Sequence, residues 1–268
     1  ALAAGLMTPA NSSLPPLQIR EQHVTVDVED GYAITEVEQV FHNPNDQDLE
    51  AYYRFPVPER GTVAEFTVWI DGKPVIGEVL EKQQARQVYE QEKAAGREAG
   101  LTEKDSYKAF DVRVQPVRAG QDTRVRLVYM QPVFVDTGIG RYVYPLEEGG
   151  VDEKKLAFWT ANDSVEEHFS FTLNLRSGYP VDALRLPKHP QAQIQQLGPQ
   201  QWQVKLDNRT ATASSEEEAN SESANFAPPA TNGQPANAFT LDQDIVVYWR
   251  HQQDLPGSVD LVAYKAPG

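Results

Sequence analysis

The sequence predicts an all-β protein made of antiparallel sandwich-like regions with a single α-helix, and three observations lead to this prediction. Apolar and polar residues alternate at every second position through much of the chain, which is typical of strands that bury one face. Asp-Gly pairs at 30–31 and 71–72 separate such segments, and this pair is a strong signal for a tight hairpin. The 268 residues also include 19 prolines and 17 glycines, a composition that favours many turns over long helices.

The first β region is expected to end near residue 137. Segment 24–29 alternates valines with polar residues, and segment 32–41 returns after the first Asp-Gly pair as its hairpin partner. A turn cluster at 43–48, rich in Asn and Asp, separates this hairpin from the next strand. Further strands are expected over 49–58, 64–70, 73–77, 108–117 and 123–133.

One helix interrupts the strands at residues 77–96, whose sequence is GEVLEKQQARQVYEQEKAAG. The segment contains no proline and ends at Gly96, which is a common helix stop. Its apolar stripe is narrow and consists of Leu80, Ala85, Val88 and Tyr89. Two interpretations remain open and are compatible: the stripe closes one end of the sandwich, or the charged face docks another domain.

The second β region begins with the alternating segment 167–175. Short strands then follow at the spacing that is typical of a sandwich, over 181–186, 192–197 and 201–206. Residues 209–238 are rich in Ser, Ala, Glu, Asn and Pro and predict a low-complexity acidic loop, because they offer little apolar surface to bury. Strand patterns resume over 239–250 and 258–265.

The predicted domain organisation has three parts. Residues 1–16 are expected to be a flexible N-terminal segment, which is small and polar enough to be the remnant of a cleaved signal. Residues 17–137 form the first sandwich with the helix. Residues 138–268 form a second, smaller β-sandwich-like domain that contains the acidic loop.

Composition excludes several functional classes. The net charge of −15 argues against nucleic-acid binding, which needs a basic face. The chain has no Cys, which excludes disulfides, Cys-ligated zinc and thiol nucleophiles. No apolar run approaches the roughly 18 residues of a membrane-spanning helix.

The sequence offers no catalytic constellation and no cofactor motif beyond a possible calcium site. There is no GxSxG, and the five histidines, at 23, 42, 168, 189 and 251, lack metal-binding spacing. Glu36 and Glu38 share one face of a strand, as a glycosidase pair would, but so does any solvated pair.

The calcium candidates lie in the turn cluster at 43–48. Their alternating oxygen ligands resemble the start of a calcium loop, although the expected Gly and the final Glu are missing. An Asn-Pro turn explains the same residues without an ion. The candidates are Asn43, Asn45, Asp46 and Asp48.

A family resemblance rests on the stretch IDGKPVIGEVLEKQQARQVYEQ. Its Asp-Gly hairpin, its Gly-Glu-Val and its Glu-Lys, Ala-Arg and Tyr-Glu pairs resemble the signature of the vault protein inter-alpha-trypsin (VIT) domain. The Asn-Pro turn, the Phe-Pro-x-Pro and the closing strands are also similar to that family, so the resemblance covers about 17–135. The motif residues that the resemblance marks for interaction are Glu78, Glu81, Lys82, Arg86, Tyr89 and Glu90.

The resemblance implies a non-enzymatic extracellular scaffold. VIT domains are commonly followed by a von Willebrand A domain, whose DxSxS metal motif does not occur in this sequence. The second β region is similar to the bridging stretch of bacterial surface proteins described as sortase targets in marine proteobacteria, and inter-alpha-trypsin heavy chains are further relatives. The implied partners are a downstream A-type domain and an extracellular protein or matrix ligand, with a location at the surface or in the periplasm of a bacterium. The alternative is a sandwich that binds or hydrolyses carbohydrate through surface carboxylates.

Overall fold

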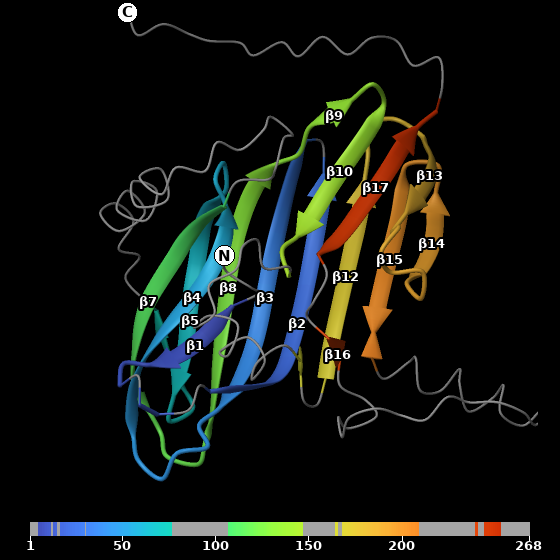
Figure 1. Cartoon of the computed structure of the whole chain (residues 1–268). Coiled ribbons are helices and arrows are strands. Elements are labelled where there is room, and N and C mark those ends of the chain that lie inside the picture. Colours follow the sequence, from blue (N-terminus) through green and yellow to red (C-terminus); the bar gives the residue numbers. More distant parts are fainter. Residues whose placement is uncertain are drawn as a thin grey trace, which may run out of the picture.

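The computed structural model describes residues 5–11, 13–14, 17–29, 31–76, 107–146, 164–165, 168–208, 239–240 and 244–252. These residues form strands β1 to β17 joined by turns, which confirms the all-β prediction (Figure 1). The predicted helix at 77–96 and the predicted acidic loop at 209–238 lie outside the described residues.

One layer of the molecule is a large sheet of eight strands. All neighbours in this sheet are antiparallel except β12 and β2, which run parallel. The spatial order is β14 (Gln193–Gly198), β15 (Gln201–Asp207), β12 (His168–Arg176), β2 (Gln18–Glu29), β3 (Tyr32–His42), β8 (Asp122–Pro132), β5 (Thr62–Ile70) and β6 (Lys73–Ile76).

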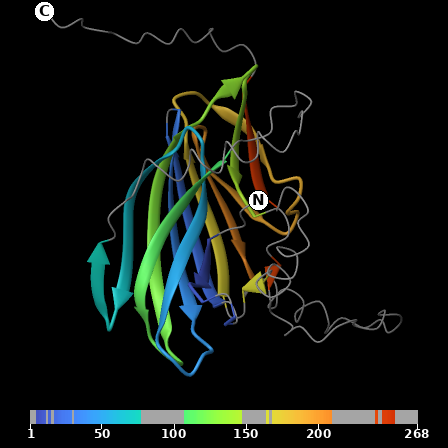
Figure 2. The same ribbon diagram turned by 60° about the vertical axis from the view of Figure 1, so that its left-hand side comes forward.

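Two smaller sheets form the second layer and lie side by side over one face of the large sheet (Figures 1 and 2). The three-stranded sheet has the order β1 (Leu6–Pro9), β4 (Leu49–Pro58) and β7 (Tyr107–Val117). The four-stranded sheet has the order β13 (Val181–Arg185), β17 (Ile245–His251), β10 (Ile139–Tyr144) and β9 (Val135–Asp136). A separate short pair consists of β11 (Ser164–Val165) and β16 (Phe239–Thr240).

The large sheet continues across the boundary that the sequence predicts after residue 137. β12, from the second region, pairs in parallel with β2, and the register places Phe171 beside Val24 and Leu173 beside Val26. All four side chains are buried in one hydrophobic core that both regions share. The two regions therefore share the large sheet and one hydrophobic core.

Part of the N-terminal segment forms a strand. Leu6–Pro9 forms β1, which pairs antiparallel with β4. Leu6 and Met7 are buried in the core, and this burial stabilises the strand.

The predicted hairpin at Asp71-Gly72 is confirmed. It joins β5 to β6, and both central residues have positive φ, 51° at Asp71 and 74° at Gly72. Positive φ at both positions is the geometry of a type I′ turn, which matches the twist of the flanking strands.

The interior of the sandwich contains polar side chains as well as apolar ones. Gln39, in the large sheet, donates from Nε2 to the Gly5 carbonyl (3.1 Å) and to Gln22 Oε1 (3.0 Å). Its Oε1 accepts a 2.8 Å bond from the Tyr53 hydroxyl of the three-stranded sheet. Gln22 Nε2 donates to the Tyr144 hydroxyl of the four-stranded sheet at 2.8 Å. These buried bonds connect the large sheet to the three-stranded and the four-stranded sheet and fix how the two layers lie against one another.

Candidate interaction surface

Several charged side chains on the outer face of the large sheet pair with each other. Arg126 lies 2.6 Å from Glu36, and Arg124 lies 2.7 Å from Glu38 while its guanidinium stands 4.4 Å from the centre of the Trp69 ring. The two carboxylates considered as a glycosidase pair are thus each held by a different arginine. Both therefore form ion pairs on the outer face of the sheet.

Two histidines meet further along this face. His23 Nδ1 lies 2.8 Å from Ser170 Oγ, and its Nε2 lies 3.4 Å from Glu21. The His168 ring packs edge-on at 4.6 Å, and its Nε2 lies 3.1 Å from Asp207. Ser, His and Glu follow one another here as in a hydrolase triad, but β12 has ladder partners on both sides. Its backbone N–H groups therefore belong to the sheet and are not arranged as an oxyanion hole, so the cluster is a cross-strand polar contact.

The Asn43 side chain organises the turn at 43–48. Its Nδ2 donates to the carbonyls of Gln47 (3.1 Å), Val117 (3.3 Å) and Arg118 (3.1 Å). Its Oδ1 accepts from the backbone N–H of Asn45 at 3.0 Å, which closes a turn of the chain. The amide therefore joins this corner to the end of β7 and already uses the oxygen proposed as a metal ligand.

Of the other calcium candidates, Asn45 contacts Asn43 by donating from Nδ2 to its Oδ1 at 2.9 Å, whereas the two aspartates are used differently. Asp48 pairs with Arg118 at 2.7 Å and accepts a 2.9 Å bond from Ala119 N, and these bonds lower the pKa of the Asp48 carboxyl. Arg118 also pairs with Asp71 at 2.7 Å, while Asp46 is exposed. Among the residues that the structure describes, no three His, Asp or Glu side chains form a metal-binding group. The geometry is that of a structural corner that one arginine joins to the hairpin at Asp71-Gly72.

The six motif residues marked by the family resemblance, Glu78, Glu81, Lys82, Arg86, Tyr89 and Glu90, lie outside the described residues. In the part of the chain that is described, no helix has the length and hydrophobicity of a membrane span.

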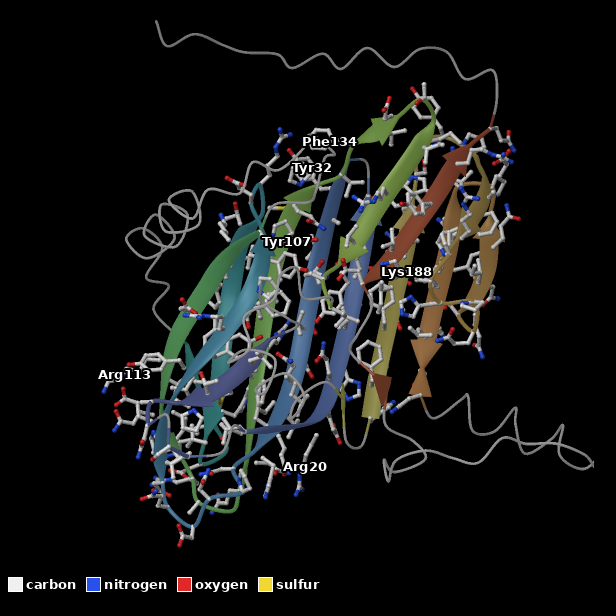
Figure 3. All side chains as sticks on the ribbon, in the orientation of Figure 1. Arg20, Tyr32, Tyr107, Arg113, Phe134 and Lys188 are labelled. Atoms are coloured by element: carbon white, nitrogen blue, oxygen red, sulfur yellow. The ribbon has the colours of Figure 1, made fainter. Side chains whose placement is uncertain are left out.

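Exposed apolar side chains gather at the upper end of the large sheet in Figure 3, where Tyr32 and Phe134 are labelled. Tyr32 is 57% exposed and Phe134 63% exposed, far above what a buried strand residue shows. Ile34 and Met130 are direct cross-strand partners on the outer face, so they extend the cluster along β3 and β8. We call this surface the apolar rim and define it as Tyr32, Ile34, Met130, Phe134, Val135 and Ile139.

A groove of about 610 Å³ adjoins the apolar rim and shares Phe134 and Ile139 with it. Its walls come from the end of β4, the start of β7, the β8–β9 connection and the four-stranded sheet. Arg60 stands 5.2 Å from the centre of the Phe134 ring and thereby places a cation at the junction of rim and groove. The walls also carry Glu59, Asp136 and Arg141, so the groove has charges of both signs.

The rim was missed by the sequence analysis, although the sequence contains a signal for it. Tyr32 and Ile34 share their face of β3 with Glu36 and Glu38, and Met130 shares its face of β8 with Arg124. Apolar residues at positions whose face is otherwise charged mark a surface that is not simply solvated.

Comparisons with known proteins find a family model that matches the first part of the chain. Residues 19–129 match the model of the family described as "Vault protein inter-alpha-trypsin domain". The von Willebrand factor A domain-containing protein 5A of Mus musculus is 29% identical over 144 residues, which are 53% of this chain and 18% of that protein. Inter-alpha-trypsin inhibitor heavy chain H6 of Homo sapiens is 30% identical over 150 residues, which are 55% of this chain and 11% of that protein.

A further similarity reaches beyond the family match. Protein mono-ADP-ribosyltransferase PARP4 of Mus musculus is 24% identical over 198 residues, which are 70% of this chain and 10% of that protein. The chain therefore spans about a tenth to a fifth of the length of these relatives.

Proposed function

Because this chain carries a vault protein inter-alpha-trypsin (VIT) domain that includes residues 19–129, we propose that it is a non-enzymatic interaction module, and that its apolar rim holds a von Willebrand A-type domain of the same polypeptide. In this proposal the double-layered sandwich is a rigid support. The partner domain lies against the end where the rim and the groove meet.

The observation that carries the proposal is the contrast between the rim and the rest of the outer face. Elsewhere on that face, charged side chains such as Arg126 and Glu36 form ion pairs that remain partly exposed to water. At the rim, by contrast, the large apolar side chains of Tyr32 and Phe134 are each more than half exposed. Large apolar side chains that cluster on a surface favour association, because burying them removes apolar area from water.

The choice of partner rests on the relatives. One of them is named for its von Willebrand factor A domain, and the matched part is a small fraction of its length. A sandwich that pairs with such a domain needs an apolar centre with polar groups around it, as in other stable interfaces. The rim supplies the centre, and Glu59, Arg60 and Asp136 stand at its border.

The absence of catalysis is part of the proposal and is supported by how the candidate groups are used. His23 and Ser170 contact each other on an open sheet, and Glu36 and Glu38 are held by arginines. The name of one relative describes ADP-ribosyl transfer, but the matched segment is 10% of that protein. We assign no such activity to this chain.

The location and the wider role follow from the resemblance to surface proteins. We propose that the module acts outside the cytoplasm, at the cell surface or in the periplasm of a bacterium, as part of an adhesion protein. The similarity to an inter-alpha-trypsin heavy chain supports this placement. The helix motif around Arg86 remains a predicted second contact.

Binding between this chain and the A-type domain of the same polypeptide tests the proposal. The double substitution Ile34→Ser and Phe134→Ser should weaken binding at least about tenfold, because it removes two of the large apolar groups that the partner would bury. Val75→Ser is the matched control, since Val75 is 45% exposed on β6, away from the rim. Equal affinity of the rim variant and the control would contradict the proposal, as would a full polypeptide without an A-type domain.

A further inference from the structure

Strand β14 is one end of the large sheet, as Figure 1 shows at its right-hand side. It pairs on one side with β15, and Ile194 stands opposite Val204 in that register. No strand among the described residues pairs with its other side. Such an edge presents backbone N–H and C=O groups that are ready to pair with another strand.

The side chains of β14 do not hide this edge. All but the last of its residues are exposed, with Ile194 41% and Leu197 54% exposed. Two apolar side chains beside an open row of backbone groups are the combination that favours strand addition.

This edge also lacks the protection that other edges of the molecule have. Residues 189–204 contain no Asp, Glu, Lys or Arg, although 24% of the chain is charged. At the opposite end of the same sheet, β6 carries Lys73 and Pro74, and at the edge of the four-stranded sheet β13 carries Asp182 and Arg185. Charges and prolines at edges normally prevent pairing between molecules.

From these features we propose that β14 pairs antiparallel with β14 of a second copy of this chain, so that the large sheet continues from one molecule into the other. A two-fold axis through the edge brings the strand against itself in the reverse direction. The backbone pattern of antiparallel strands then matches on both sides of the axis.

Charge favours a second copy at this place. The chain has a net charge of −15, so two copies repel each other over most of their surfaces. Around β14 the chain carries no charged side chains, so two copies can meet there without electrostatic repulsion between like charges. The side chains of Gln193 and Gln195 add self-complementarity, because each amide both donates and accepts a hydrogen bond.

The paired segment is short, and this determines the strength of the contact. The register of β14 shifts at a bulge between Gln196 and Gly198, and Pro199 follows directly. Regular pairing is therefore limited to Gln193–Gln196 and its immediate neighbours. A contact of this size belongs to the small class of interfaces, so the dimer forms and dissociates with concentration.

Sedimentation analysis of the whole chain over a range of concentrations tests this proposal. The unmodified chain should pass from monomer to dimer as its concentration rises. Gln195→Lys should raise the dissociation constant at least about tenfold, because two lysines then face each other near the axis. Gln195→Glu should do the same. An equimolar mixture of the two variants should restore the dimer, since opposite charges then meet across the axis.

Two control variants locate the contact. Val75→Lys, at the opposite edge of the large sheet, and Phe134→Ser, at the apolar rim, should leave the dissociation constant of the dimer unchanged. A chain that stays monomeric at every concentration would overturn the proposal. So would a dimer that survives Gln195→Lys, or one that is lost in either control.

Discussion

The Tyr53 hydroxyl donates a 2.8 Å hydrogen bond to Gln39 Oε1, and this buried contact joins the three-stranded sheet to the large sheet. Gln39 is at the same time bonded to Gly5 and to Gln22, so one side chain satisfies three buried groups. A buried polar group without a partner costs about 1–3 kcal/mol, which makes this residue a sensitive point of the sandwich.

Replacing Gln39 should therefore destabilise the fold more than removing one of its partners. We expect Gln39→Leu to lower the free energy of unfolding by about 3 kcal/mol, because the Tyr53 hydroxyl, the Gly5 carbonyl and Gln22 Oε1 all lose the hydrogen bond that Gln39 makes with them. Tyr53→Phe removes one bond and should cost about 1 kcal/mol. Urea unfolding of both variants gives the comparison, and equal losses would show that the network does not act through Gln39.

Buried tyrosines should make the fold sensitive to high pH. Burial raises the pKa of Tyr129 to about 12 and holds the pKa values of Tyr53, Tyr142 and Tyr144 well above their usual range. In the unfolded chain these phenols lose their protons near pH 10, so above that pH the folded state binds more protons than the unfolded state. The stability is thus fully present below about pH 10 and falls as the pH rises towards 12.

An alkaline titration followed by circular dichroism and by tyrosinate absorbance checks the predicted loss of stability at high pH. Part of the absorbance change of the 11 tyrosines should appear together with the loss of structure. Complete ionisation before any unfolding would contradict the burial of these hydroxyls.

Gly140 is predicted to be essential for packing of the four-stranded sheet. A Cβ atom at this position would overlap the indole of Trp249, its cross-strand partner, which is only 3% exposed. We expect Gly140→Ala to lower the free energy of unfolding by about 1–3 kcal/mol, the usual range for overpacking. Gly198→Ala is the matched control, because a Cβ there meets nothing within 4 Å. Thermal unfolding of the two variants should separate them clearly, and equal midpoints would argue against close contact with Trp249.

The corner at residues 43–48 should depend on Asn43 rather than on calcium. Asn43→Ala removes the amide that donates to three backbone carbonyls and should cost about 2 kcal/mol. Millimolar calcium should not raise the melting temperature of the unmodified chain, because Asp48 is engaged with Arg118. A calcium-dependent rise that is absent from Asp48→Asn would instead identify a metal site at this corner.

The sequence was a good guide to single strands and to tight turns. The alternation of Val24, Val26 and Val28 and the Asp71-Gly72 pair are local signals, and the structure shows the strand and the turn that they predict. Alternation reports which face of a strand is buried, and turn residues report a backbone geometry. Both depend on neighbours in the chain, which a sequence displays directly.

The relation between distant strands was not accessible in this way. The parallel pairing of Phe171 with Val24 joins segments that are far apart in the chain, and no local pattern specifies it. Gln22 and Gln39 occupy inward positions that a simple apolar-polar alternation assigns to apolar residues. They are buried because partners from other sheets satisfy them, and such partners are visible only in the fold. The apolar rim likewise forms only when β3, β8 and the β9–β10 hairpin come together.

Amide hydrogen exchange tests most directly whether the apolar rim holds another domain of the same polypeptide. Exchange is compared between this chain alone and the full-length protein. We predict slower exchange in the full-length protein for the backbone of residues 130–139, which carries most of the rim, and unchanged exchange for β6 at the far edge of the sheet. Identical exchange at residues 130–139 in the two proteins would contradict the proposed role of the rim.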